Sequence, residues 1–108
     1  MRQAGVYRNE IFAGLLIEEE DGHFTFRYDD AYFQNDNMPS ISLTLTKKQQ
    51  TYKRDYLFSF FFNMLSEGAN KRLQCRHYQI DEKDSFGLLL ATAQYDTIGA
   101  VTIKPISA

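Results

Sequence analysis

The chain of 108 residues has room for one domain with a single small core, which excludes a two-lobed enzyme with separate cofactor and substrate domains. Hydrophobic residues make up 44% and charged residues 24% of the sequence, a composition typical of a folded globular protein. The formal charge of -2 comes without any long run of like charges, which argues against direct nucleic-acid binding and against a polybasic membrane anchor.

The cysteine content and the first residues of the chain both favour the cytoplasm. Cys75 is the only cysteine, whereas short chains of oxidising compartments usually carry several disulfides. Residues 1–10 lack the apolar core of a signal peptide, and no stretch approaches the roughly 20 apolar residues that span a bilayer. We therefore expect a cytoplasmic protein without membrane attachment.

Three strands are predicted in the first third of the chain. Residues 4–8 alternate weakly, residues 11–17 are almost entirely apolar, and residues 23–28 alternate at period two with three aromatic side chains on one face. The pair Asp21 and Gly22, just before the third run, is a strong hairpin signal. These runs predict an antiparallel meander.

The next part of the chain predicts a loop, a further strand and an exposed segment. Residues 29–40 are rich in Asp and Asn and include Pro39, which disfavours a helical residue before it, so at most one short turn is expected there. Residues 41–45 alternate as a strand would. The polar residues 47–53 are expected to be exposed.

Residues 56–67 predict a helix, with Asp55 as its N-cap and Gly68 as its C-terminal stop. On such a helix three polar positions, including Ser59 and Asn63, form one narrow stripe. Nearly all other positions are apolar, so the apolar surface is wider than the face of about 100° that a small domain buries. Either the sheet and the later helices cover this surface, or part of it contacts another protein.

The last third of the chain completes the pattern. Residues 69–78 are basic and compatible with a short helix, and residues 84–93 predict a helix that Asp84 caps. Residues 96–99 predict a turn, and residues 100–105 predict a closing strand that ends at its proline.

Strands followed by helices and a final strand predict an α+β fold, as one domain over residues 1–108. The sheet is expected to be a small, mostly antiparallel sheet or a barrel-like meander. Two to three helices are expected to pack on one side of it.

No catalytic or metal-binding constellation is found, so we expect no enzymatic activity, no metal ion and no cofactor. His23 and His77 lie far apart and in no metal-ligand spacing. Cys75 stands beside Arg76, which would favour a thiolate, but no second cysteine or orienting acid accompanies it. The six glycines are scattered singly, so no phosphate-binding loop is formed.

Five short motifs follow one another along nearly the whole chain: Phe24–Tyr28, Ile41–Leu45, Phe61–Gly68, Asp84–Leu89 and Asp96–Val101. In this order they resemble the N-terminal subdomain of HipA-type serine/threonine kinases, the toxins of bacterial toxin–antitoxin modules. The third motif is similar to the family pattern Phe-Phe-x-x-Leu-Leu-Pro-Glu-Gly, and the fifth to Asp-x-x-Gly-Ala-Val before a closing strand.

The resemblance implies a non-enzymatic antitoxin. In HipA-like kinases the ATP-binding loop, the catalytic Asp and the metal-binding residues lie downstream of this subdomain. A separate copy of it is similar to HipS-like antitoxins of three-gene modules, which inhibit a separately encoded HipT kinase while a HipB-like protein binds DNA. The alternatives are a structural subunit that completes or activates such a kinase, and a transcriptional co-regulator that acts through a HipB-like partner.

Residues 56–65 form a phenylalanine-rich segment. The loop after this segment is the expected contact with the kinase, because it protrudes after a helix. An ordinary helix end without a partner is the alternative. The family tends to have proline where this chain has Ser66, and an aromatic residue where it has Ala69. An aromatic plug would here have to come from Phe60 or Tyr56. The candidate partner-binding residues are Ser66, Glu67, Gly68, Ala69, Asn70, Lys71, Arg72 and Phe60.

Overall fold

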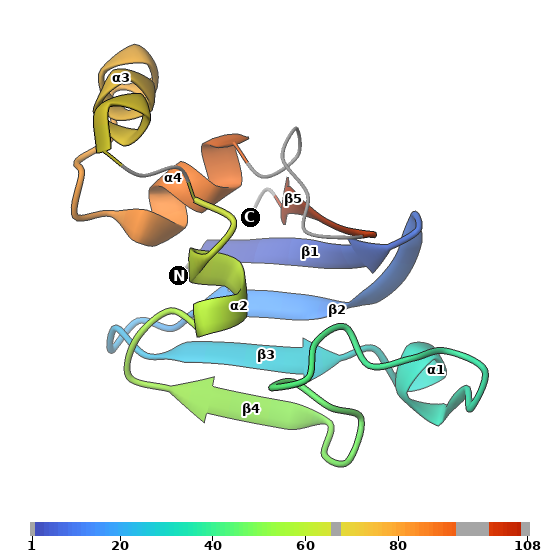
Figure 1. Cartoon of the computed structure of the whole chain (residues 1–108). Coiled ribbons are helices and arrows are strands. Elements are labelled where there is room, and N and C mark those ends of the chain that lie inside the picture. The colour runs from blue at the N-terminus through green and yellow to red at the C-terminus, as the bar shows by residue number, and fades with distance from the viewer. Residues whose placement is uncertain (1, 66–67, 93–99, 107–108) are drawn as a thin grey trace.

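The computed structural model describes residues 2–65, 68–92 and 100–106, which form a five-stranded antiparallel sheet with helices packed on it (Figure 1). The strands are β1 (Arg2–Arg8), β2 (Ile11–Glu18), β3 (Phe24–Tyr28), β4 (Thr51–Arg54) and β5 (Val101–Ile106). Within the same ranges the helices are α1 (Asp30–Gln34), α2 (Ser59–Phe62), α3 (Gly68–Tyr78) and α4 (Ser85–Thr92). The predicted α+β fold is confirmed, with four described helices in place of the expected two to three.

The strand order β4-β3-β2-β1-β5 places the last strand beside the first and leaves β4 and β5 at opposite edges (Figure 1). A closed barrel would need hydrogen bonds between these two edge strands. The sheet is open, so the barrel-like alternative is wrong.

The predicted meander of three strands is confirmed. Asn9 and Glu10 join β1 to β2, and both have positive φ angles, 49° and 68°, which suit the twist of a two-residue hairpin. Asp21 and Gly22 lie in the turn between β2 and β3, where Gly22 has a φ of 90°. Local turn chemistry was sufficient to predict this part of the sheet.

The predicted strand over residues 41–45 is wrong, because this segment is a loop that the core holds at its two ends. The Tyr28 hydroxyl donates to the carbonyl oxygen of Leu45 and accepts from the Ile41 N–H at 3.0 Å. Ile41 and Leu45 are buried, whereas Leu43 between them is 97% exposed. The buried residues are four positions apart, so the burial does not follow the period of two that a strand would show.

The fourth strand comes instead from the segment predicted to be exposed. β4 pairs with β3, and Tyr52 lies opposite Phe26 with its ring buried. The following Lys53 and Arg54 are exposed. Because most residues of this segment are polar, the sequence pattern did not indicate a strand.

The long helix predicted over residues 56–67 is also wrong. α2 has four residues, it begins after Phe58, and no side chain caps it. Leu57 and Phe58 are buried in the core, but they lie before the helix and not on it. The predicted stop residue, Gly68, is the first residue of α3.

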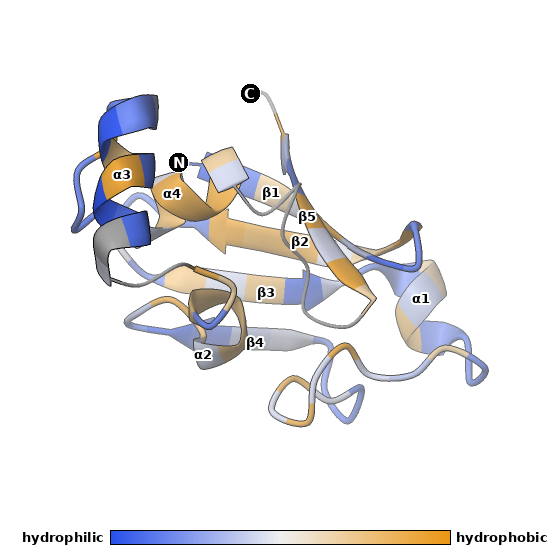
Figure 2. Cartoon of the chain, turned by 45° about the horizontal axis from the view of Figure 1, so that its top comes forward, coloured by the Kyte–Doolittle hydropathy of each residue, from blue (hydrophilic) through white to orange (hydrophobic). Residues whose placement is uncertain are grey.

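Aromatic rings join the helices to one face of the sheet. The ring of Phe61 on α2 lies 5.8 Å from that of Phe26, and the ring of Phe86 on α4 lies 5.8 Å from that of Phe24. α4 also packs against β5, and α3 packs on the outside of α4 (Figures 1 and 2). The core therefore lies between this face and the layer of α2, α4 and the loop before β4.

The remaining predictions for the last third are confirmed where the structure describes them, apart from the end of the closing strand. The Gly87 N–H donates to Asp84 Oδ1 at 3.0 Å, which is the predicted cap of α4. The closing strand pairs with β1 as predicted, but the prediction that it ends at Pro105 is wrong, because β5 continues to Ile106. An edge strand tolerates this proline. The turn predicted over residues 96–99 lies outside the described residues.

Candidate partner-binding surface

The phenylalanine-rich segment divides into buried and exposed rings. Phe58 and Phe61 are 4% and 0% exposed and contact each other edge to face at 6.1 Å. Phe60 is half-buried against Phe61, with a centroid distance of 5.3 Å. Tyr56 and Phe62 are 64% and 43% exposed. The domain thus encloses part of this segment and leaves two aromatic side chains on its surface.

These two exposed rings border a hollow of about 540 Å³ between α2, the adjoining ends of β2 and β3, and the beginning of α4. Phe24, Leu57 and Phe86 contribute its apolar lining. The polar lining comes from Glu18, Asp55, Ser59, Asn63, Lys83, Asp84 and Ser85. An apolar hollow with a polar rim is the usual form of a site that receives a side chain or a short segment of a partner.

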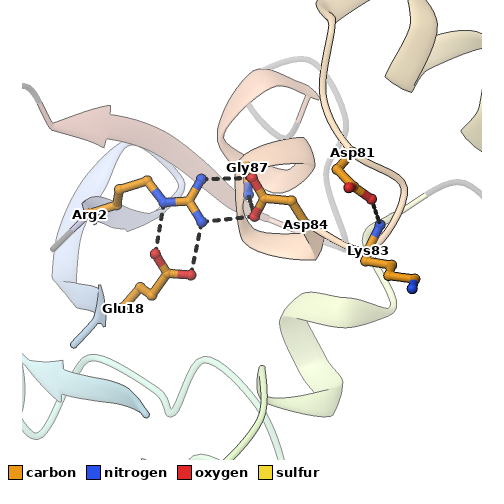
Figure 3. Close-up of polar contacts among 6 residues, drawn as sticks. All are labelled: Arg2, Glu18, Asp81, Lys83, Asp84 and Gly87. Carbon is orange, nitrogen blue, oxygen red and sulfur yellow. Dashed lines mark hydrogen bonds and ion pairs between the residues drawn. The ribbon is translucent and has the colours of Figure 1, made fainter. Parts of the chain in front are cut away.

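One wall of the hollow is clamped by Arg2 (Figure 3). Its guanidinium donates two hydrogen bonds of 2.8 Å to Glu18, and bonds of 2.8 and 3.0 Å to the two carboxylate oxygens of Asp84. It also lies 5.4 Å from the ring centroid of Phe86. The clamp therefore joins β1 and β2 to the first turn of α4.

The clamp, formed by Arg2, Glu18 and Asp84, stabilises the charged forms of Arg2 and Asp84. Hydrogen bonds to Asp84 and Glu18 raise the pKa of Arg2, and the bond from Arg2 lowers the pKa of Asp84. A Cβ atom at Gly87 would collide with the Asp84 carboxylate, so glycine leaves the room that the clamp needs. The sequence indicated Asp84 only as a helix cap, because nothing local relates it to Arg2, which lies 82 positions away.

A second polar contact ties the segment before α2 to the β2–β3 hairpin. His23 Nδ1 lies 2.9 Å from Asp21, and His23 Nε2 lies 2.9 Å from Asp55. The hydrogen bond with Asp21, together with the two nearby carboxylates, raises the pKa of His23. His23 was predicted to be an ordinary strand residue, and Asp55 a helix cap; the structure instead brings them together beside the hollow.

The predicted contact loop continues into α3, a helix with a basic surface. Ser66, Glu67 and the side chain of Ala69 lie outside the described residues. Gly68 has a φ of 63°, and Asn70 and Arg72 are exposed while Lys71 is half-buried.

Further along α3, Arg76 and His77 are exposed in its last turn, and Leu73 is 61% exposed. Among the described side chains of α3 only Cys75 is buried. Figure 2 accordingly shows this helix as mostly hydrophilic. α3 therefore offers much of its surface to a partner.

Binding is the chemistry that this arrangement supports best. Among the residues that the structure describes, no group of three or more His, Cys, Asp or Glu side chains is placed to hold a metal ion. No helix in the described ranges is long and apolar enough to cross a membrane. The described residues thus form a small α+β domain with an open sheet, an apolar hollow and an outlying basic helix.

The family follows from comparison with known proteins. The family model described as the HipA N-terminal domain matches residues 4–104, so the chain belongs to this family. A solved structure described as the N-terminal domain of HipA toxin is 29% identical, with a TM-score of 0.74 over 99% of this chain and 94% of that chain. No curated protein matches the sequence.

A second structure has the same fold at lower identity. It is the Shewanella oneidensis MR-1 toxin–antitoxin system HipA, HipB and its operator DNA complex, 18% identical with a TM-score of 0.71. The match covers 97% of this chain and 24% of that chain. The resemblance inferred from the five motifs is thus confirmed at the level of family and fold.

Proposed function

We propose that this protein is a non-enzymatic cytoplasmic antitoxin that binds and inhibits a separately encoded HipA-like or HipT-like serine/threonine kinase. The observation that carries the proposal is the pair of exposed rings, Tyr56 and Phe62, beside an apolar hollow in a HipA N-terminal domain. An antitoxin of this kind would form between two proteins the contacts that a domain fused to its kinase makes within one chain.

The proposed contact surface consists of the hollow, residues 66–67 and the beginning of α3 from Gly68 to Arg72. Burial of Tyr56 and Phe62 supplies the apolar contribution, and the basic residues favour an acidic rim on the kinase. Inhibition requires tighter binding to the inactive than to the active arrangement of the kinase lobes, or occlusion of the cleft between them.

Co-expression with a HipA-like kinase encoded beside this chain tests the proposal. We expect growth rescue, co-purification and loss of kinase activity, and we expect Phe62→Ser to weaken all three. Ile11→Ser is the matched control, because Ile11 is 44% exposed, close to the 43% of Phe62, and lies at the other end of β2. Absence of both rescue and co-purification would refute the proposal.

The sign of the effect on kinase activity separates inhibition from the main alternative. A structural subunit would raise the activity of the purified kinase or stabilise it, whereas an antitoxin lowers its activity. A transcriptional co-regulator would instead change operator binding by a HipB-like protein, which gel shifts with the whole complex measure.

A further inference from the structure

The face of the sheet opposite α2 and α4 carries an apolar stripe that no described helix or loop covers. Residues 11–17 of β2 are apolar on both sides of the strand, a pattern typical of strands that are buried on both faces. On the covered face Leu16 is fully buried, whereas its neighbours Leu15 and Ile17 point the other way and are half-buried. Figure 2 shows β2 as hydrophobic along most of its length.

Contacts between neighbouring strands define this stripe. Tyr7 of β1 lies opposite Phe12 of β2, and their rings meet edge to face at 5.4 Å. Both rings lean over Gly5, where a Cβ atom would lie 3.0 Å from Tyr7 and 3.5 Å from Phe12. Gly5 itself pairs with Leu15. Tyr7, Phe12, Leu15 and Ile17 therefore form a continuous apolar surface on this face.

Two lysines bracket the stripe on the edge strands. Lys53 of β4 is in register with Thr25 and Ile17, and Lys104 of β5 is in register with Gly5. The Lys104 ammonium lies 4.8 Å from the ring centroid of Tyr7. Both lysines are exposed and form no ion pair with the described residues.

Three other charged side chains lie near this face. Arg27 pairs with Asp30 at 3.0 Å, and Glu19 accepts a hydrogen bond from the Thr25 hydroxyl at 3.0 Å. Glu19 keeps its negative charge, and the two lysines are the cations of this face that have no ion-pair partner among the described residues. In a chain with a formal charge of -2, they give this face a local positive border.

We propose that this open face is a docking surface for an amphipathic α-helix of a partner protein, with an apolar seam and carboxylates on both flanks. From Phe12 to Ile17 the stripe runs roughly 17 Å along β2, which matches about three helical turns. Each lysine lies two strands from β2, about 10 Å to either side, which leaves room for one helix of about 10 Å diameter. Carboxylates on that helix would face Lys53 and Lys104.

This surface is distinct from the hollow beside α2, and its test contains no kinase. The probe is a synthetic 15-residue helical peptide with a leucine seam flanked by glutamates; the matched peptide has lysines in place of the glutamates. Binding to the full chain is followed by amide chemical shifts. We expect the acidic peptide to bind at least about fivefold more tightly and to shift the amides of Gly5, Leu15 and Ile17.

Three variants sharpen the test. Leu15→Lys should abolish binding of the acidic peptide, and the double variant Lys53→Glu, Lys104→Glu should reverse the preference between the peptides. Lys48→Glu, an exposed lysine on the loop before β4, should leave the preference unchanged. The charge variants keep the test valid if Leu15→Lys impairs folding.

Equal binding of the two peptides, no binding of the acidic one, or shifts confined to Tyr56 and Phe62 would overturn the proposal. So would a concentration-dependent dimer that Leu15→Lys dissociates and that blocks the peptide, because the occupant would then be a second copy of this chain.

Discussion

Two aromatic side chains of β3 and those of the segment around α2 play different parts in the same domain. Phe26 and Tyr28 on β3 are fully buried, whereas the α2 segment buries Phe58 and Phe61 and leaves Tyr56 and Phe62 exposed. A regular strand places alternate rings on the covered face of the sheet. A single helical turn places adjacent rings in different directions, so the second region serves both the core and the surface.

The largest effect expected from this comparison separates two adjacent phenylalanines. Phe61→Ala should lower the free energy of unfolding by about 3–5 kcal/mol, because it empties a fully buried site between the rings of Phe26, Phe58 and Phe60. Phe62→Ala should cost less than about 1 kcal/mol, because much of that ring is already in water. Denaturant unfolding of both variants measures the difference, and equal losses would contradict the division.

A smaller effect is expected for the hydroxyl that holds the loop at residues 41–45. Tyr28→Phe keeps the buried ring and removes the group that bonds the Ile41 N–H and the Leu45 carbonyl. Two backbone groups lose their partner, so the free energy of unfolding should fall by about 1–3 kcal/mol. Because burial raises the pKa of Tyr28 to about 12, this contribution should persist to pH 10. Slower amide exchange at Ile41 in the variant would contradict the assignment.

The clamp beside the hollow should contribute less. Asp84→Asn keeps an oxygen to cap α4 but removes the charge that meets Arg2, and the expected loss at neutral pH is about 1 kcal/mol because water screens this partly exposed pair. The pKa of Asp84 is held below its ordinary value of 3.8, so the carboxylate stabilises the fold above that value.

This stabilisation is lost as the pH falls through the lower folded-state pKa of Asp84. The free energy of unfolding of Asp84→Asn should therefore fall less steeply on acidification than that of the parent. Unfolding midpoints measured from pH 7 down to pH 3 test this, and parallel curves would show that the pair adds nothing to stability.

The contact of His23 with Asp21 and Asp55 should give the smallest effect. Because the pKa of His23 is raised above its ordinary value of 6.5, its contribution is complete below that pH and is lost as the pH rises through the higher folded-state pKa. His23→Gln should flatten the stability curve between about pH 6 and 8. A curve unchanged by His23→Gln would show that the two aspartates bind an uncharged ring.

Turn and cap chemistry made several elements predictable before any tertiary contact was known. The Asp21 and Gly22 turn, the Asp84 cap and the strand before Pro105 depend on residues close together in sequence, and all three are present. Periodicity was a weaker guide. The sequence alternation of residues 41–45 resembles that of a strand, but the segment is a loop whose backbone is bonded to the hydroxyl of Tyr28.

The candidate surface was predictable only in part. The excess of apolar residues in the phenylalanine-rich segment left two outcomes open, burial within the domain or contact with another protein, and the structure leaves two rings exposed. Nothing in the order of residues showed that these would be Tyr56 and Phe62 and not Phe60. That choice depends on α2 being a single turn, with Leu57 and Phe58 buried before it.

The sequence by itself determined the α+β class, the meander of the first three strands and the resemblance to the HipA family, because turn residues, caps and motif order are local properties. The tertiary structure decided which segment became β4, how Arg2 joins β1 to α4, and which face of the sheet stays open. These features depend on hydrogen-bond partners and burial contributed by distant residues, which no local pattern can specify.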